Sequence, residues 1–145
     1  MKPFPHYYQS HPMDCGPICL KMIAEYYGVY FNPQYMDSFS SITIEGMSML
    51  TLADEVLKLG FTPTSMKVDL GNLGKIELPV ILHWNRCHFV VLYQIKNGSY
   101  YIADPAKGIF SLRKMAFLKH WQFLQSSDCR EGIVMTLTTS HTTDQ

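Results

Sequence analysis

The stretch QSHPMDCGPICLKM, residues 9–22, decides the fold, because it places a cysteine between an acidic residue and a Gly-Pro pair at the start of an apolar helical pattern. From Cys15 onward the apolar side chains recur at helical spacing, and Gly28 follows as a stop signal. We therefore predict a helix from about Asp14 to Tyr27 that begins at the thiol.

Composition sets the bounds around this helix. The 145 residues fit one domain, residues 1–145, with a polar tail from about residue 138. An apolar fraction of 47% and a charged fraction of 17% describe a folded protein, and 12 basic against 12 acidic residues argue against a nucleic-acid partner. No apolar run approaches the roughly 20 residues of a membrane span, so we expect a soluble chain without membrane insertion. The spacing of the four cysteines is unlike a disulfide framework, which indicates reduced thiols in a cytosolic setting.

The chain changes character after Gly60. Before it, residues 48–60 form a second helical pattern, and a shorter helix is expected around residues 33–39. After it come runs rich in β-branched and aromatic residues that predict strands, at 79–84, 88–95, 99–104 and 132–139. One further helix is expected near residues 112–121. Helices first and strands later predict an α+β domain with the helices packed on an antiparallel sheet.

Cys15 is the candidate nucleophile, with an ordinary core cysteine as the alternative. The first turn of a helix leaves backbone N–H groups unpaired, and its dipole favours an anion such as a thiolate. A cysteine in a helix is more often a core residue, but Gly16 removes bulk beside the sulfur and Pro17 suits a first turn. Cys19, one turn further along on an apolar face, is interpreted as core.

A nucleophilic cysteine needs a base, and the sequence offers His6, His11, His83, His88, His120 and His141. His88 opens a strand, where a rigid element can hold an imidazole, and His83 at the end of another strand competes with it. A third group favours His88, because Asp104 ends the next strand just before Pro105 and can orient an imidazole through its other ring nitrogen. An Asp before Pro is otherwise an ordinary turn residue.

The turn between these two strands decides whether His88 and Asp104 can meet. A two-residue turn at Asn97-Gly98 would pair Asp104 with Val91, on the opposite face from His88, and the two side chains would then need a bulge to meet. A three-residue loop at 96–98 puts both on one face, offset by about 7 Å along the strand. We therefore predict the three-residue loop.

Gln9 completes the set of candidate site residues. It lies six residues before Cys15, near enough for its amide to point at the sulfur from the preceding loop. Together with the backbone N–H of Cys15 it would form an oxyanion hole. A lone glutamine in a loop is usually only solvated, so this assignment needs independent support.

That support comes from five segments in order: Gln9, DCGPICLKM from Asp14, EGMSMLTLADEVLKLGF, PVILHW with HFVVLYQI, and YYIADPAKG. Together, over roughly residues 7–121, they resemble the bacteriocin-processing cysteine peptidases, which are double-glycine leader peptidase domains of peptide-exporting ABC transporters. The resemblance implies a papain-like fold with Cys15 as nucleophile, His88 as base, Asp104 as orienting acid and Gln9 as oxyanion donor. All four are present, and we assign no cofactor and no metal.

The resemblance also implies a function. We expect a thiol endopeptidase that cuts a leader peptide after a Gly-Gly or Gly-Ala pair, acting with the transmembrane and ATPase domains of an ABC exporter at the cytoplasmic face of a bacterial inner membrane. The leader in this family is an amphipathic helix, so we expect an apolar groove on the surface. Exposed tyrosines such as Tyr26, Tyr27 and Tyr30 can line it, with a place in the core as the alternative for most of them.

Two rival hypotheses remain. A catalytically silent module of the same fold would hold an export substrate without cutting it, and would leave Cys15 with no task. A zinc site built from Cys15, Cys19, Cys87 and His88 is the other, although Cys87 and His88 would face opposite sides of a strand. Mutation of Cys15 tests the first hypothesis, and metal analysis of the purified protein tests the second.

Overall fold

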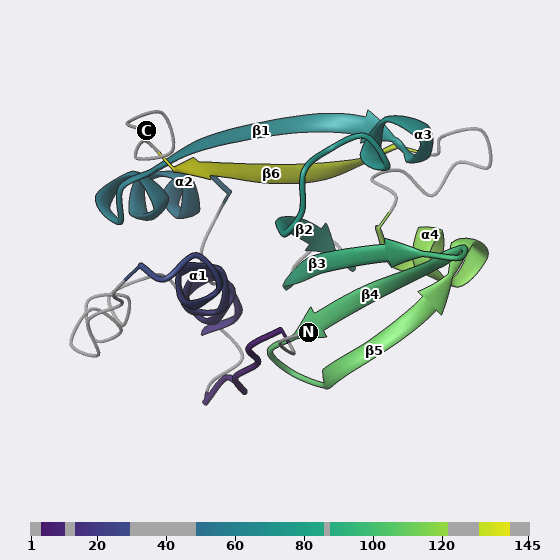
Figure 1. The fold of residues 1–145 in the computed structure, drawn as a ribbon, viewed down its shortest axis with the longest axis horizontal. Coiled ribbons are helices and arrows are strands. Elements are labelled where there is room, and N and C mark those ends of the chain that lie inside the picture. The colour runs from purple at the N-terminus through teal and green to yellow at the C-terminus, as the bar shows by residue number, and fades with distance from the viewer. Residues whose placement is uncertain (1–3, 11–13, 30–48, 86–87, 122–130, 140–145) are drawn as a thin grey trace.

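The described residues of the computed structural model, 4–10, 14–29, 49–85, 88–121 and 131–139, form one antiparallel sheet with helices on both sides (Figure 1). The strands are β1 (Phe61–Asp69), β2 (Val80–Trp84), β3 (His88–Lys96), β4 (Ser99–Asp104), β5 (Gly108–Arg113) and β6 (Glu131–Thr139). Their order across the sheet is β1-β6-β2-β3-β4-β5, and every adjacent pair is antiparallel. The α+β class predicted from the sequence is confirmed.

The helices are α1 (Cys15–Tyr26), α2 (Met49–Lys58), α3 (Leu70–Leu73) and α4 (Lys114–Trp121). The first two match the prediction to within one or two residues. The helix expected near 112–121 begins later, at Lys114, because the two preceding residues belong to β5. The helix expected at 33–39 lies outside the described residues. No helix in the described part of the chain is long and apolar enough to cross a membrane.

Two strands, β1 and β5, were not predicted. Strand β1 contains a proline and mostly polar residues, and it lies at the edge of the sheet, where a missing N–H is tolerated. Strand β5 is short and lies at the opposite edge. A polar tail was expected from about residue 138, but Thr138 and Thr139 pair with Thr62 and Phe61 at the end of β6.

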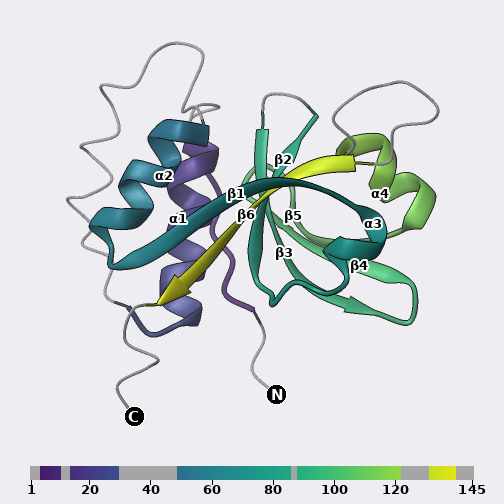
Figure 2. The ribbon, with the colours of Figure 1, turned by 90° about the horizontal axis from the view of Figure 1, so that it is seen from above.

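The central strands are buried on both sides, so their alternate residues enter two different cores. One core joins α1 and α2 to the sheet through Ile81, Val91, Ala103 and Met135. The other lies under α4 and contains Val80, Leu82, Val90, Leu92, Ile102, Phe117 and Trp121. Figure 2 shows α1 and α2 on one side of the strands and α4 on the other.

The turn between β3 and β4 differs from the prediction. Asn97 and Gly98 form a two-residue turn, both with positive φ (54° and 78°), as a type I′ turn requires. Lys96 pairs with Ser99, but the register shifts between Leu92 and Gln94. The predicted three-residue loop was wrong. A β-bulge at Tyr93 inserts one unpaired residue into β3 instead. It has the same effect as the longer loop, because it places Asp104 on the same face of the sheet as His88.

Candidate active site

Cys15 is the first residue of α1, and the residue is 6% exposed. The side chain of Asp14, at the N-cap, makes no capping hydrogen bond, so it does not occupy the N–H groups of the first turn. Gly16 and Pro17, which follow Cys15, are both buried. The thiol therefore lies at a helix N-terminus in a confined setting.

His88 and Asp104 meet at the ends of β3 and β4. The Nε2 of His88 donates a hydrogen bond to Oδ1 of Asp104 over 2.7 Å, and the same oxygen accepts the backbone N–H of Ala106 at 2.8 Å. Asp104 is 2% exposed, and the side chain of His88 is 17% exposed. The prediction that these two side chains share a face is confirmed. A buried carboxylate held by two donors can fix the orientation and tautomer of the imidazole.

The charges of this pair follow from its surroundings. Burial lowers the pKa of His88, but its hydrogen bond to Asp104, its interactions with Cys15 and the charge of Asp104 outweigh burial and raise the pKa to about 9. For Asp104, burial raises the pKa, but the bonds from His88 and Ala106 outweigh it and hold the pKa below its ordinary value. The pair thus favours an imidazolium beside a carboxylate.

Gln9 is held by its backbone beside the turn that follows Asp104. Its N–H donates to the carbonyl of Pro105 at 2.9 Å, which ties the residue to the turn that follows Asp104. The Oε1 of its side chain is buried and has no hydrogen-bond partner among the described residues. Unpaired buried polar atoms are costly and concentrate at functional positions. Gln9 is therefore unlike an ordinary solvated loop glutamine.

The histidines divide clearly among different partners. His83, the competitor of His88, lies against the ring of Phe89 at 5.8 Å, and His120 bonds to Oδ1 of Asn85 through its Nδ1 at 2.8 Å. His6 donates from Nε2 to the backbone carbonyl of Asp104 at 2.8 Å, a contact that sequence reasoning missed because it weighed His6 only as a base. His11 and His141 lie outside the described residues.

The second cysteine of α1 is a core residue, as predicted. Cys19 is fully buried, and burial raises its pKa well above the ordinary value for a thiol. Cys87, a ligand of the zinc hypothesis, lies outside the described residues. Within the ranges that the structure describes, no group of three or more His, Cys, Asp or Glu side chains is placed to hold a metal ion.

Comparison with protein families finds one match over most of the chain. Residues 3–125 match the model of the peptidase C39 family. Among curated proteins, the chain is 30% identical over 105 residues to the colicin V secretion/processing ATP-binding protein of Escherichia coli, covering 72% of this chain and 15% of that protein. It is 32% identical over 120 residues to the lactococcin-G-processing and transport ATP-binding protein of Lactococcus lactis, covering 79% and 17%. The chain thus spans less than a fifth of the length of these relatives.

Solved structures agree with this match. A double glycine motif protease from an AMS/PCAT transporter, in complex with the leader peptide, superposes with a TM-score of 0.82 at 25% identity, covering 94% of this chain and 91% of that one. The peptidase domain of Streptococcus ComA, a bifunctional ABC transporter, superposes with a TM-score of 0.78 at 24% identity, covering 94% and 98%. The predicted papain-like fold is confirmed.

Proposed function

The chain belongs to the peptidase C39 family of cysteine peptidases, and we propose that it is a thiol endopeptidase that cleaves a leader peptide after a Gly-Gly or Gly-Ala pair. The observation that carries the proposal is the imidazole of His88, which is bonded to the buried carboxylate of Asp104 at 2.7 Å and also interacts with Cys15. Nucleophile, base and orienting group form such a chain in thiol peptidases.

In the proposed reaction the Cys15 thiolate attacks the carbonyl carbon of the scissile bond. The negative charge that develops on the carbonyl oxygen is met by the backbone N–H of Cys15 and the side-chain amide of Gln9. The protonated His88 then gives its proton to the leaving nitrogen, and the leader remains as a thioester on Cys15. Water, deprotonated by His88, hydrolyses the thioester and restores the thiolate.

The burial of the site supports a preference for glycine and alanine. Cys15 is only 6% exposed, and the His88 side chain is only 17% exposed. A peptide must therefore bring its backbone close to a confined sulfur, and a large side chain next to the scissile bond would hold the carbonyl away. A misplacement of about 1 Å costs about a hundredfold in rate, so exclusion of bulk is sufficient to give specificity.

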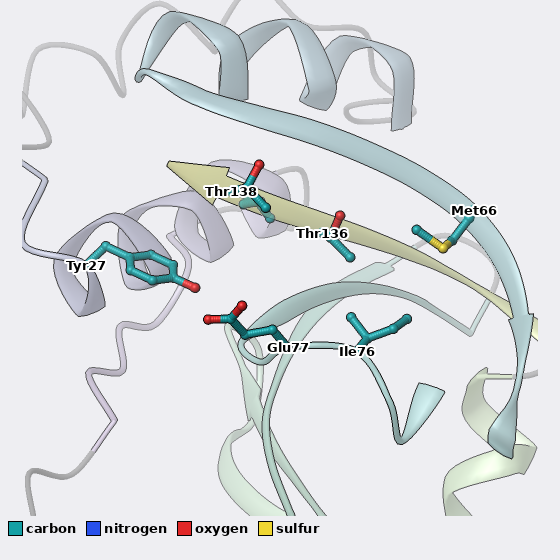
Figure 3. Close-up of a pocket in the computed structure, with 7 residues that line it drawn as sticks. Tyr27, Met66, Ile76, Glu77, Thr136 and Thr138 are labelled. Carbon is teal, nitrogen blue, oxygen red and sulfur yellow. The ribbon is translucent and has the colours of Figure 1, made fainter. Parts of the chain in front are cut away.

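A cavity of about 430 Å³ at the other end of α1 is the proposed seat of the leader helix (Figure 3). Its lining combines apolar side chains with a few polar groups: Tyr27, Met66, Ile76, Glu77, Thr136, Leu137 and Thr138. Tyr27 was among the tyrosines expected to line a groove. It follows Cys15 by twelve residues of helix, a distance of about 18 Å. About five or six extended leader residues would span that gap.

The relatives extend the proposal to its cellular setting. The two curated relatives are named as secretion/processing or processing and transport ATP-binding proteins. We propose that this peptidase acts in the same way, with the transmembrane and ATPase domains of an ABC exporter at the cytoplasmic face of a bacterial inner membrane. Cleavage there would release the cargo peptide at the point where export begins.

Two peptides test this function. One carries an amphipathic helical leader ending in Gly-Gly, and the other has Val in place of the glycine just before the scissile bond. We expect cleavage of the first and at least a hundredfold slower cleavage of the second, with the two binding affinities equal within about threefold. Cleavage is followed by mass spectrometry and binding by calorimetry, with the Cys15→Ala variant used for binding.

Each other outcome has a definite meaning. Equal cleavage of both peptides would indicate a broad thiol peptidase and contradict the leader specificity. Binding of both peptides without cleavage of either would favour the silent binding module. Full activity after chelation, with no metal in the purified protein, would remove the zinc hypothesis.

A further inference from the structure

The segment from Phe4 to Ser10 is fixed to the rest of the molecule at several points before the chain reaches α1. The Phe4 ring stacks on Tyr93, with centroids 4.7 Å apart and ring planes at 8°, and also contacts Tyr26 at 5.5 Å. The hydroxyl of Tyr8 lies over Gly108, only 2.9 Å from where a Cβ would be placed. Figure 2 shows this N-terminal segment running between α1 and the sheet.

Two hydrogen bonds join this segment to the turn that follows β4. His6 donates from Nε2 to the carbonyl of Asp104 at 2.8 Å, and the N–H of Gln9 donates to the next carbonyl, that of Pro105, at 2.9 Å. The His6 ring is further held edge-to-face against Tyr8 at 4.6 Å. Asp104 therefore bonds two histidines, His88 through its carboxylate and His6 through its backbone.

The side chain of Gln9 has no comparable support of its own. Its Oε1 is buried and makes no hydrogen bond with any residue that the structure describes. The placement of the amide therefore depends on where the backbone of Gln9 is held. That backbone is held at Gln9 itself by Pro105 and, three residues earlier, by the bond from His6.

We propose that His6 is a positioning residue, which fixes the Gln9 amide relative to the turn that carries Asp104. The inference rests on the proposed function, because it assumes that Gln9 is the oxyanion donor. It assigns to His6 no contact with substrate. Both hydrogen bonds attach the N-terminal segment to the turn after β4. They hold the Gln9 amide in a fixed position relative to the His88–Asp104 pair.

A double-mutant cycle between His6 and Gln9 tests the inference. His6→Phe removes the donor and keeps a ring against Tyr8. We expect it to lower kcat by about tenfold to a hundredfold and to leave KM within about threefold, because a displaced oxyanion donor weakens only the transition state. Gln9→Ala should lower kcat by about 10²- to 10³-fold. In the Gln9→Ala background, His6→Phe should cost less than about threefold, because there is no amide left to position.

Rescue and a matched control separate positioning from general loosening. His6→Gln keeps a donor for the Asp104 carbonyl and should recover most of kcat. His120→Phe is the control, because His120 is also half-buried and makes a 2.8 Å ring hydrogen bond, to Asn85. The factor by which His120→Phe changes kcat should be the same in the unaltered protein and in the Gln9→Ala background. Thermal melting is recorded for every variant, and Phe4→Leu, which loosens the other end of the segment, should show the same coupling to Gln9.

The outcomes distinguish this inference from the proposed function. An equal loss of kcat from His6→Phe in both backgrounds, or no loss at all, would overturn the positioning role while the peptidase stands. A Gln9→Ala variant with unchanged kcat would overturn the oxyanion role of Gln9 and the positioning role with it. Absence of cleavage by the unaltered protein would instead contradict the peptidase function itself.

Discussion

The site region and the layer under α4 are both well buried, yet they are built from different residues. The site region contains the thiol of Cys15 and the carboxylate of Asp104, which is the one buried charged side chain among the described residues. The layer under α4 contains aromatic rings in contact, with Phe117 stacked on Tyr100 at 4.3 Å and tilted against Trp121 at 5.4 Å. Rings in close contact stabilise a fold, whereas a buried carboxylate needs partners. The comparison predicts that turnover and stability respond to different substitutions.

The largest effect is expected from Cys15→Ala. Removing the nucleophile should lower kcat by about 10⁴- to 10⁶-fold. The folded state should be retained, because a small buried side chain is replaced by a slightly smaller one. Cleavage assays and circular dichroism measure the two quantities. Before mutation, limiting iodoacetamide should label Cys15 ahead of the other cysteines, and labelling of Cys87 or Cys129 with loss of activity would contradict the assignment.

The opposite pattern is expected from Trp121→Ala. Trp121 is 2% exposed, and its indole N–H donates to the carbonyl of Ile133 at 3.2 Å. Loss of a large buried ring should lower the free energy of unfolding by about 3–5 kcal/mol. Activity per folded molecule should stay within about threefold at a temperature where the variant is folded. Denaturant unfolding measures the stability, and active-site titration gives the activity per folded molecule. A large fall in kcat with unchanged stability would contradict the distinction between the two regions.

A smaller loss of stability is expected from Gly132→Ala in β6. A Cβ at this position would lie 2.3 Å from Cε2 of Trp121, so the indole or the strand would have to shift. Overpacking of this kind costs about 1–3 kcal/mol. Gly71→Ala, where the nearest atom would be 3.8 Å away, is the matched control and should have little effect by comparison. Equal melting temperatures for the two variants would show that the contact is not as tight as described.

The smallest effect is a shift in pH dependence. The raised pKa of His88, about 9, predicts that kcat/KM falls as pH rises through about 9, because the imidazolium loses the proton that the leaving nitrogen needs. The same interactions stabilise the fold fully below pH 6.5, and this contribution is lost as pH rises through about 9. Asp104→Asn should move the basic limb to lower pH and retain some activity. If the basic limb of the kcat/KM profile does not move in Asp104→Asn, a group other than His88 titrates near pH 9.

The parts of the fold that were predictable follow from strong local patterns. The apolar helix after Cys15 and the β-branched strands around His88 and Asp104 repeat over many residues, so periodicity alone identifies them. Strand β1 was missed because Pro63 and its polar neighbours suit only an edge, and the sequence does not show where an edge lies. The role suggested for His6 was also hidden, because its partner is a backbone carbonyl 98 residues away.

The bulge at Tyr93 gives this protein an unusual kind of vulnerability. It makes the number of residues between His88 and Asp104 as important as the identity of these two residues. Successive side chains of a strand point to opposite faces of the sheet, so a change of one residue moves a side chain to the other face. Loss of one residue from this stretch would send one of the two polar partners to the opposite side of the sheet, although both sides of the central strands are apolar. A deletion that preserves each member of the proposed triad can thus separate the base from its carboxylate, so an inventory of site residues in a related gene does not establish activity unless the spacing is preserved as well.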